Sequence, residues 1–304
     1  MELGQAKKIF VIAKKSQNLS PRTLETYEEV CRKFFEWLVD TQDIYIVEEI
    51  TPETIRSYFV SLQEKGLRGV TQHRHFRTLR TFFKFLYQND YVKEYALKNV
   101  KPPKKEIYVI RTFTAQEISK MLKHFDKSGF VGCRNYCILC LLFSTGIRKE
   151  ELLNLNLADI NIGNDLIRVD GKGKRQRLVP IGRTMHRVLI QYLRMREEFL
   201  KGEFCEWLFV TNSLVRKMSP SCVSSIFRRI KSDLKLSGEK ISCHTFRHTF
   251  AKNYLLNGGD LVSLQAILGH SDIITTRNYL NLNEKEIKTQ HSLFNPLDNR
   301  DWLF

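Results

Sequence analysis

The sequence predicts a mainly α-helical protein with a small antiparallel β-sheet, divided into two domains. Three observations support this fold class. The first third of the chain shows helical spacing of apolar residues, a segment rich in proline and lysine follows it, and two short strand-like runs lie near the middle. With 304 residues, of which 42% are hydrophobic, the chain is long enough to bury a separate core in each domain.

Three helices are expected in the first third. Ser20-Pro21 and Thr51-Pro52 each combine an N-cap residue with a proline at the first helical position. A third helix covers about 71–88, where aromatic residues and cations are interleaved. This pattern fits contact with a DNA backbone and fits an ordinary amphipathic surface helix equally well. The cations in question are Arg74, Arg77, Arg80 and Lys84.

A stiff, extended linker is expected around Pro102-Pro103, which is flanked by lysines. We therefore expect a helical domain at residues 1–103 and a second domain at residues 107–304. The expected elements of the second domain are, in order, a capping-box helix at Thr114, an apolar helix at 133–145, strands at 166–169 and 177–180, further helices after 184, and a short strand at 207–210.

The charge of the chain indicates its class of partner. Lysine and arginine number 49 against 33 acidic residues, which gives a formal net charge of +16. This excess favours a polyanion, with nucleic acid first and an anionic membrane surface second, although a basic protein without such a partner is the alternative. The chain shows no transmembrane run and no signal-peptide pattern at its start, so we expect a cytoplasmic protein with no membrane partner.

Seven scattered cysteines argue against a disulfide framework and favour a reducing cytoplasm. Cys133, Cys137 and Cys140 are spaced i, i+4 and i+7, as metal ligands or as one buried face of a helix. Because no fourth ligand lies at zinc spacing, we favour the buried face and expect no metal and no other cofactor.

Residues 243–280 combine cations, imidazoles and a tyrosine in an otherwise apolar, helix-patterned segment. His244 and Arg247 share one face of an expected helix, His270 follows a glycine, and Tyr279 lies on the next helix. Such groups suit one reaction, in which cations hold a phosphate while a phenol attacks it. Taken alone, however, a tyrosine at this position is more often a packing residue.

Further cations lie upstream of this segment. Arg148 directly follows the apolar helix, and Glu151, three residues later, is spaced to hold its guanidinium. Lys172 lies at the tip of the expected hairpin, where a lysine can reach a leaving oxygen and protonate it. Each has a simpler explanation on its own, namely a surface salt bridge and a solvated turn. The other hairpin cations, expected to contact a DNA backbone, are Lys174, Arg175 and Arg177.

The order of these segments is Thr-Gly-Ile-Arg-x-x-Glu-Leu, Gly-Lys-Gly, His-x-x-Arg-His, Leu-Gly-His and a tyrosine nine residues later. This order closely resembles the tyrosine recombinase (phage integrase) superfamily, and the Xer recombinases most of all, over nearly the whole chain. The resemblance implies a two-domain C-shaped clamp: a helical, SAM-like core-binding domain followed by an α+β catalytic domain.

The resemblance also implies the reaction, which is cleavage and rejoining of DNA strands through a 3′-phosphotyrosine. The covalent intermediate conserves the energy of the phosphodiester bond, so neither ATP nor a metal is needed. The implied site has Arg148 and Arg247 as the phosphate clamp, Tyr279 as the nucleophile, Lys172 as the acid for the 5′ oxygen, His244 as an aid to deprotonation, His270 as a hydrogen-bond partner of the phosphate, and Glu151 as support.

The end of the chain is rich in large apolar side chains that need burial. They can pack on the protein's own core or on a neighbouring subunit, and the exchange of C-terminal segments in the resembled family favours the neighbour. The partners expected are therefore a double-stranded DNA recombination site, a homo- or hetero-tetramer on it, and possibly a second recombinase or a regulator. The residues concerned are Ile287, Leu293, Phe294, Trp302, Leu303 and Phe304.

Three alternatives stay open at this point. A role in chromosome dimer resolution competes with integration or resolution for a mobile element. A monomeric topoisomerase would use the same chemistry, although the apolar tail argues against it. A DNA-binding protein without catalysis would lack one of the catalytic groups, and the sequence contains all of them. The target DNA sequence does not follow from these residues.

Overall fold

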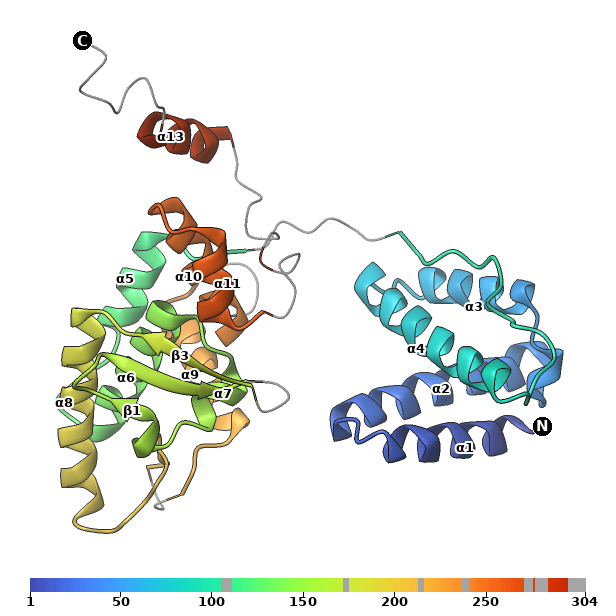
Figure 1. Cartoon of the computed structure of the whole chain (residues 1–304), viewed down its shortest axis with the longest axis horizontal. Coiled ribbons are helices and arrows are strands. Elements are labelled where there is room, and N and C mark those ends of the chain that lie inside the picture. Colours follow the sequence, from blue (N-terminus) through green and yellow to red (C-terminus); the bar gives the residue numbers. More distant parts are fainter. Residues whose placement is uncertain are drawn as a thin grey trace. The chain divides into compact units, whose positions relative to one another are not determined.

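The computed structural model describes residues 1–104, 111–171, 175–212, 216–236, 241–270, 276 and 284–294. It confirms a mainly α-helical protein with a small antiparallel sheet (Figure 1). The chain divides into two compact units, Met1–Tyr108 and Val109–Phe304. The expected limits of the domains, residues 103 and 107, stay a prediction, and residue 107 lies within 105–110, which the structure does not describe.

The first unit is wholly helical. The two predicted proline starts are confirmed, because Ser20 and Thr51 each accept a hydrogen bond from the backbone three residues later. The first helix of the chain was not predicted; its N-cap residue, Glu2, makes no side-chain cap bond, so the sequence carries no start signal there. The elements are α1 (Leu3–Ser16), α2 (Pro21–Gln42), the 3-10 turn η1 (Val47–Glu49), α3 (Pro52–Glu64) and α4 (Gly69–Gln88).

Aromatic rings fill the core of the first unit. Phe34, at the centre of α2, lies 4.8 Å from Tyr58 of α3 and 6.1 Å from Phe83 of α4, measured between ring centroids. Phe10 of α1 meets Phe82 of α4 edge to face. Each pair joins two different helices, and aromatic contacts add to the free energy gained by burying apolar area. The four helices therefore share one core and present their charged faces outward.

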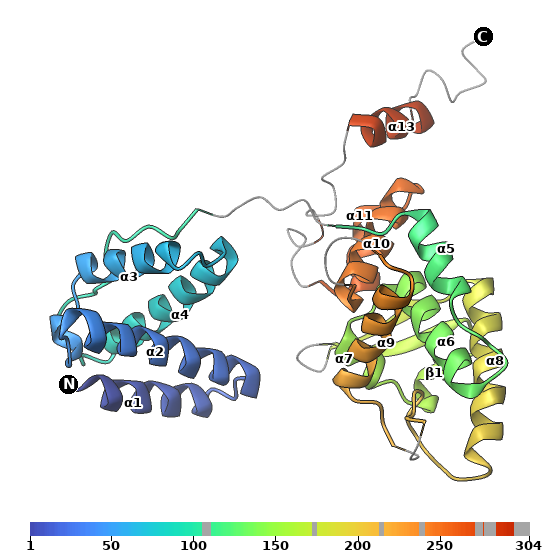
Figure 2. The ribbon, with the colours of Figure 1, turned by 180° about the vertical axis from the view of Figure 1, so that it is seen from behind.

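The second unit surrounds the apolar helix α6 (Figures 1 and 2). That helix packs against α5, α8 and α10. The described elements of the second unit are α5 (Ala115–Lys123), α6 (Phe130–Thr145), α7 (Lys149–Leu153), the turn η2 (Leu157–Asp159), β1 (Ile160–Asn161), β2 (Leu166–Asp170), β3 (Gln176–Pro180), α8 (Arg183–Leu200), α9 (Pro220–Asp233), α10 (Cys243–Leu256), α11 (Leu261–Leu268) and α13 (Glu284–Phe294).

The cysteines of α6 form a helix face, as predicted. Cys133 and Cys137 are buried, at 2% and 0% exposed, in the same core as Ile138 and Leu141. Burial raises the pKa of the Cys137 thiol well above its usual range, so the group stays a neutral thiol at physiological pH. These cysteines therefore serve as small hydrophobic side chains in the core.

The sheet has the order β1-β2-β3, with antiparallel pairing throughout. Val169 on β2 and Val179 on β3 are fully buried, while the alternate residues face outward. Val169 is paired with Arg177, the second residue of β3. This register brings Arg177 to the base of the hairpin.

The predicted strand at 207–210 is wrong. Trp207 and Val210 form only two isolated bridges, to Asn156 and Lys217. Side chains occupy the intervening backbone, because the Leu208 carbonyl accepts hydrogen bonds from the Tyr192 hydroxyl and from Nε of Arg196. With that acceptor taken by side chains, no regular ladder extends through this segment.

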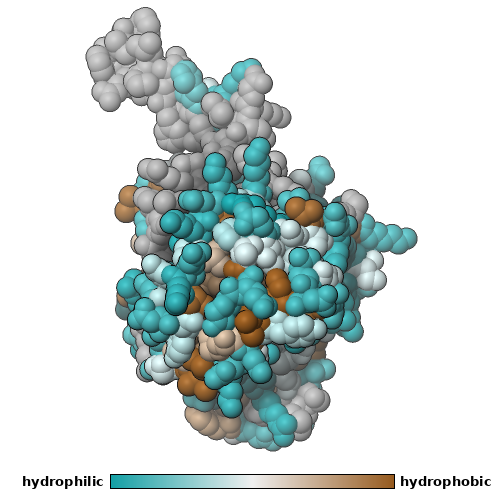
Figure 3. Space-filling view, turned by 90° about the vertical axis from the view of Figure 1, so that its right-hand side faces the viewer, coloured by the Kyte–Doolittle hydropathy of each residue, from teal (hydrophilic) through white to brown (hydrophobic). Residues whose placement is uncertain are grey.

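Figure 3 presents a mainly hydrophilic surface with scattered hydrophobic residues. Such scattered residues are usual on a globular protein and mark no broad apolar face in this view. Among the described residues, no helix is both long and apolar enough to cross a membrane.

Candidate active site

Arg247 lies on α10 and is only 3% exposed. Its Nη1 donates to the Gly146 carbonyl at 2.7 Å, and its Nη2 donates to the Leu268 carbonyl at 2.8 Å. These carbonyls belong to the C-terminal end of α6 and the last residue of α11, where unpaired carbonyls carry partial negative charge. Dipoles at two helix ends thus hold the guanidinium, and because a carbonyl has no net charge, these contacts do not neutralise it.

Arg148 also contacts the C-terminal end of α11. Gly146 adopts a left-handed conformation (φ +61°), which ends α6 and turns the chain toward Arg148 at the N-cap of α7. Nη1 of Arg148 lies 3.4 Å from the Leu268 carbonyl, and Nη2 lies 3.4 Å from the Gly269 carbonyl. Both arginines therefore meet at the Leu268 carbonyl, although they lie 99 positions apart in the sequence.

Glu151 supports Arg148, as its spacing predicts. Its Oε1 accepts from Nη1 of Arg148 at 2.7 Å, and its Oε2 accepts from the backbone N–H of Arg148 at 2.8 Å. Burial alone would raise the pKa of this carboxyl. Hydrogen bonds from Arg177 and from the Arg148 backbone and side chain outweigh burial and lower the pKa to about 2. Glu151 is therefore a carboxylate at physiological pH.

Arg177 differs from the sequence expectation of a DNA backbone contact. Its side chain is only 11% exposed, and its Nη1 and Nη2 donate to the two oxygens of Glu151 at 3.0 and 2.8 Å. Its Nε donates to the Ile267 carbonyl of α11 at 2.7 Å. The guanidinium is turned into the protein because a buried carboxylate and a helix-end carbonyl attract it more strongly than solvent does.

His270 follows α11 and lies beside Arg247. Nη2 of Arg247 is 2.7 Å from Nε2 of His270, and Nδ1 of His270 is 2.8 Å from the buried hydroxyl of Thr276. Burial, together with the nearby charges of Arg247 and Arg148, lowers the pKa of His270 to about 4, so the ring is neutral at physiological pH. Because arginine can only donate, Nε2 is the acceptor here and Nδ1 carries the proton.

His244 lies one turn before Arg247 on α10 and is exposed. Burial of part of the ring and the charge of Arg247 lower its pKa, which favours the neutral form. His248 is half-buried, and burial together with the neighbouring His244 and Arg247 lowers its pKa to about 4. Both imidazoles are therefore favoured in the neutral form at physiological pH, in which one ring nitrogen can accept a hydrogen bond.

Three predicted site residues, Tyr279, Lys172 and Lys174, lie outside the described residues, and their roles stay predictions. Arg175 is exposed, as a DNA contact requires. On α4, the exposed cations are Arg77, Arg80 and Lys84, whereas Arg74 is half-buried.

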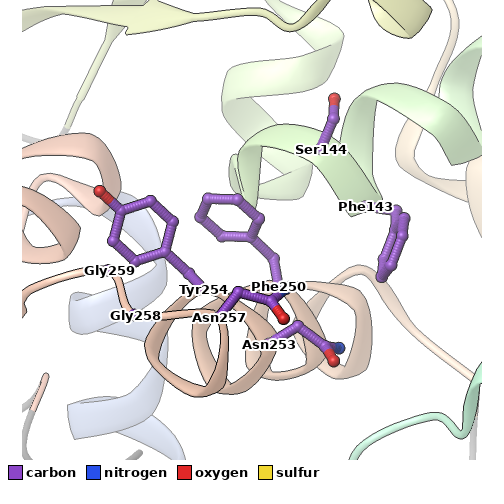
Figure 4. A pocket seen from close by; sticks show the side chains of 8 residues that line it. All are labelled: Phe143, Ser144, Phe250, Asn253, Tyr254, Asn257, Gly258 and Gly259. Atoms are coloured by element: carbon purple, nitrogen blue, oxygen red, sulfur yellow. The ribbon is translucent and has the colours of Figure 1, made fainter. Parts of the chain in front are cut away.

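Within the described ranges, no three His, Cys, Asp or Glu side chains are grouped so that they could hold a metal ion. A hollow does lie beside the end of α6, walled largely by α10 (Figure 4). Its lining mixes aromatic rings with amides and glycines: Phe143, Ser144, Phe250, Asn253, Tyr254, Asn257, Gly258 and Gly259.

Two partners in this site were not predicted from the sequence. Thr276 is hydrogen-bonded to Nδ1 of His270, but the sequence Ile-Ile-Thr-Thr carries no signal for that role. The Leu268 carbonyl, which both arginines share, is a backbone group at a helix end. The Leu-Gly sequence before His270 indicates such an end, because glycine favours the left-handed conformation (φ +64° at Gly269).

The sequence matches the Phage integrase family over residues 111–286 and the N-terminal SAM-like domain of phage integrase over residues 13–90. The first match spans more than half of the chain. Tyrosine recombinase XerC from Bacillus pumilus is 32% identical over 283 residues, covering 92% of both chains. Tyrosine recombinase XerD from Halalkalibacterium halodurans is 28% identical, covering 93% of this chain and 94% of its own.

Solved structures give the same result for the fold. XerH site-specific recombinase bound to a difH substrate is 23% identical, with a TM-score of 0.76 over 96% of this chain and 85% of its own. A lambda integrase dimer bound to a core site gives a TM-score of 0.73 at 19% identity, over 90% of this chain and 97% of its own. The chain therefore belongs to the phage integrase family of tyrosine recombinases, enzymes that break and rejoin DNA strands in site-specific recombination.

Proposed function

We propose that Arg148 and Arg247 clamp the scissile phosphate of a DNA recombination site while Tyr279 attacks it. The supporting observation is the meeting of the two guanidiniums at the Leu268 carbonyl, which places two cations on one small surface. Two fixed guanidiniums stabilise the charge that develops on the non-bridging oxygens, and such preorganised cations are usually the largest contribution to catalysis of this type. The product is a 3′-phosphotyrosine with a free 5′ hydroxyl on the other strand end.

The remaining groups complete the proton transfers. Lys172 protonates the departing 5′ oxygen, and neutral His244 assists removal of the tyrosine proton, which an unperturbed phenol holds up to a pH of about 10. A 5′ hydroxyl from a second cleaved strand then attacks the phosphotyrosine and releases the tyrosine, so the number of phosphodiester bonds is unchanged.

We propose a tautomer change at His270 during phosphate binding. In the free site, Nε2 accepts from Arg247 and Nδ1 donates to Thr276. When Arg247 turns this donor to the phosphate, Nε2 must carry a proton in order to donate to a phosphate oxygen. The Thr276 hydroxyl can reverse its role and donate to Nδ1, since a hydroxyl both donates and accepts. The ring stays neutral throughout.

A nicked suicide duplex tests the reaction, because loss of the short strand end after cleavage traps the covalent intermediate. Wild-type protein should form a protein–DNA adduct that survives denaturing electrophoresis, and Tyr279→Phe should form none while binding DNA equally well. Arg148→Ala should cleave far more slowly without a comparable loss of binding. If wild-type protein forms no adduct on a DNA site that it protects in footprinting, the proposed reaction is wrong and the protein is a DNA-binding protein without catalysis.

The first unit is the proposed core-binding domain, and we propose that it contacts the duplex through α4. Arg77, Arg80 and Lys84 are spaced i, i+3 and i+7 on α4 and are all exposed. That spacing aligns three cations on one face of the helix, where they can follow a phosphate backbone. Arg175 is the corresponding proposed contact on the second unit.

We also propose a tetramer on two DNA sites, in the cytoplasm, joined by exchange of C-terminal segments. The apolar residues Trp302, Leu303 and Phe304 support this proposal, since large apolar side chains favour burial against another surface. In the single chain, Glu286 of α13 forms an ion pair with Lys252 of α10 at 2.7 Å. Light scattering on DNA should give four protomers for wild-type protein and fewer for Trp302→Ala/Phe304→Ala; four protomers with this variant would remove the tail from the proposal.

A further inference from the structure

Glu151 is a carboxylate shared by two arginines. Oε1 accepts from Nη1 of Arg148 and Nη1 of Arg177, and Oε2 accepts from the backbone N–H of Arg148 and Nη2 of Arg177. All four distances lie between 2.7 and 3.0 Å. The carboxylate is 4% exposed, so these hydrogen bonds replace nearly all of its hydration. It is held in a single orientation from two sides.

The charge balance of this group depends on Arg177. Arg148 and Glu151 alone form a neutral pair, and a neutral pair has little long-range attraction for a phosphate. With Arg177 added, two cations share one carboxylate and the group carries a net charge of +1. The Arg148 side chain remains 30% exposed, whereas that of Arg177 is 11% exposed. The exposed cation can therefore bind an anion while the buried cation neutralises Glu151.

Arg177 also connects three segments that carry site residues. It lies on β3, its Nη groups hold Glu151 of α7, and its Nε holds the Ile267 carbonyl near the end of α11. Gly269, directly before His270, packs against its side chain, since a Cβ there would come within 3.0 Å of Cδ of Arg177. A guanidinium can bind both oxygens of a carboxylate and still donate from Nε to a carbonyl, whereas a lysine ammonium is a single point charge.

We infer that Arg177 is a positioning residue for strand cleavage: by neutralising and orienting Glu151 and fixing the end of α11, it keeps the positive charge of Arg148 uncompensated and aimed at the scissile phosphate. This inference rests on the proposed phosphate clamp. This positioning role replaces the DNA backbone contact that the sequence alone suggests for Arg177. The Nε, Nη1 and Nη2 atoms of Arg177 all donate hydrogen bonds within the protein.

Single-turnover cleavage of the nicked suicide duplex at saturating protein tests the inference separately from DNA binding. Arg177→Met should cleave roughly 10- to 100-fold more slowly than wild type, because small displacements of a catalytic group cost about this much. Arg177→Lys should lie between the two, and it provides the measurement if Arg177→Met fails to fold. The matched control is Arg168→Met on β2, whose side chain is 48% exposed and paired with Asp159, and it should cleave at the wild-type rate.

The pH profile distinguishes positioning from a general loss of stability. The charged and titratable groups of the site are Arg148 on α7, Arg177 on β3, Arg247 on α10, His270 after α11, and Glu151 itself. Glu151 stays ionised in wild-type protein from pH 8 to 5. Without Arg177 its pKa rises, so it becomes protonated as the pH falls and no longer orients Arg148.

The ratio of Arg177→Met to wild-type cleavage should therefore fall from pH 8 to 5, and the ratio for Arg177→Lys should change less. A constant ratio, or Arg177→Met cleavage equal to that of Arg168→Met, overturns the inference. The wild-type reaction on the same gel tests the proposed function separately. If wild-type protein forms no adduct, the proposed function fails, whereas the inference about Arg177 concerns only the ratio of the two cleavage rates.

Discussion

Arg247 shows how a buried cation can remain available for an anionic substrate. Its described partners are two backbone carbonyls and an imidazole nitrogen, all of them uncharged. A buried carboxylate would cancel its charge, as Glu151 partly does for Arg148. Burial among dipoles has a desolvation cost, and an incoming phosphate can offset that cost because it adds a negative charge. This is the physical basis of the phosphate-binding role proposed for Arg247.

Thr276→Val tests the proposed tautomer change at His270. Valine keeps the shape of the buried threonine but can neither accept from Nδ1 nor donate to it. We expect single-turnover cleavage to fall by about tenfold, which corresponds to the loss of one hydrogen bond worth about 1.4 kcal/mol. Thr276→Ser keeps the hydroxyl and should restore most of the rate. Wild-type cleavage by Thr276→Val, at an unchanged melting temperature, would refute the tautomer change.

At the scale of elements, the site is built from helix ends. The C-terminal end of α6 supplies the Gly146 carbonyl, and that of α11 supplies the Leu268 carbonyl, to the same guanidinium. Gly146 and Gly269 end these helices in left-handed conformations. A helix that ended one residue earlier or later would move its carbonyls away from Arg247, because successive residues are rotated by about 100° around the helix axis. The lengths of the helices thus set the position of the clamp.

Gly146→Ala should destabilise the second unit and impair cleavage. Alanine is strained at φ +61°, and its Cβ would come within 2.6 Å of Cδ1 of Phe250 and 2.9 Å of Cδ2 of Leu268. Chemical denaturation should show a loss of about 2 kcal/mol or more. The control is Gly182→Ala at the N-cap of α8, where φ is −84° and nothing lies within 4 Å of the new Cβ. Equal stabilities of the two variants would contradict this account of Gly146.

At the scale of the whole molecule, the net charge of +16 supplies affinity for DNA without sequence specificity. The neutral or buried groups of the site contribute little to that attraction, whereas exposed cations on α4 are free to approach a backbone. We therefore expect affinity and catalysis to be carried by different residues. This separation allows substitutions that weaken one and spare the other.

Arg77→Ala/Arg80→Ala/Lys84→Ala should weaken DNA binding and flatten its dependence on salt. Each phosphate contact contributes about 0.9 to the slope of log K against log [salt], so the slope should fall by up to about 3. The control is Arg56→Ala on α3, an exposed cation paired with Glu53 of its own helix. Binding measured by fluorescence anisotropy at several salt concentrations gives both slopes. A triple variant with an unchanged slope would exclude α4 from the DNA surface.

Local patterns in the sequence predicted those elements whose signals are local. The cap residues Ser20, Thr51 and Thr114 mark helix starts that the structure contains, because a cap is formed within four residues of chain. α1 escaped prediction because it has no such cap. The strand expected at 207–210 does not form, because its carbonyls bind side chains from α8, a long-range contact that no local pattern contains.

The sequence by itself determined the fold class, the family and the identities of the catalytic candidates, because these depend on composition, spacing and motif order. Only the tertiary structure decided which cations stay exposed and which become structural. Arg148 and Arg177 look alike as basic residues in polar stretches, yet one keeps a solvent-facing side and the other is buried against Glu151 and Ile267. The physical reason is that desolvation and partner geometry, which set the role of a charge, arise from segments far apart in the chain.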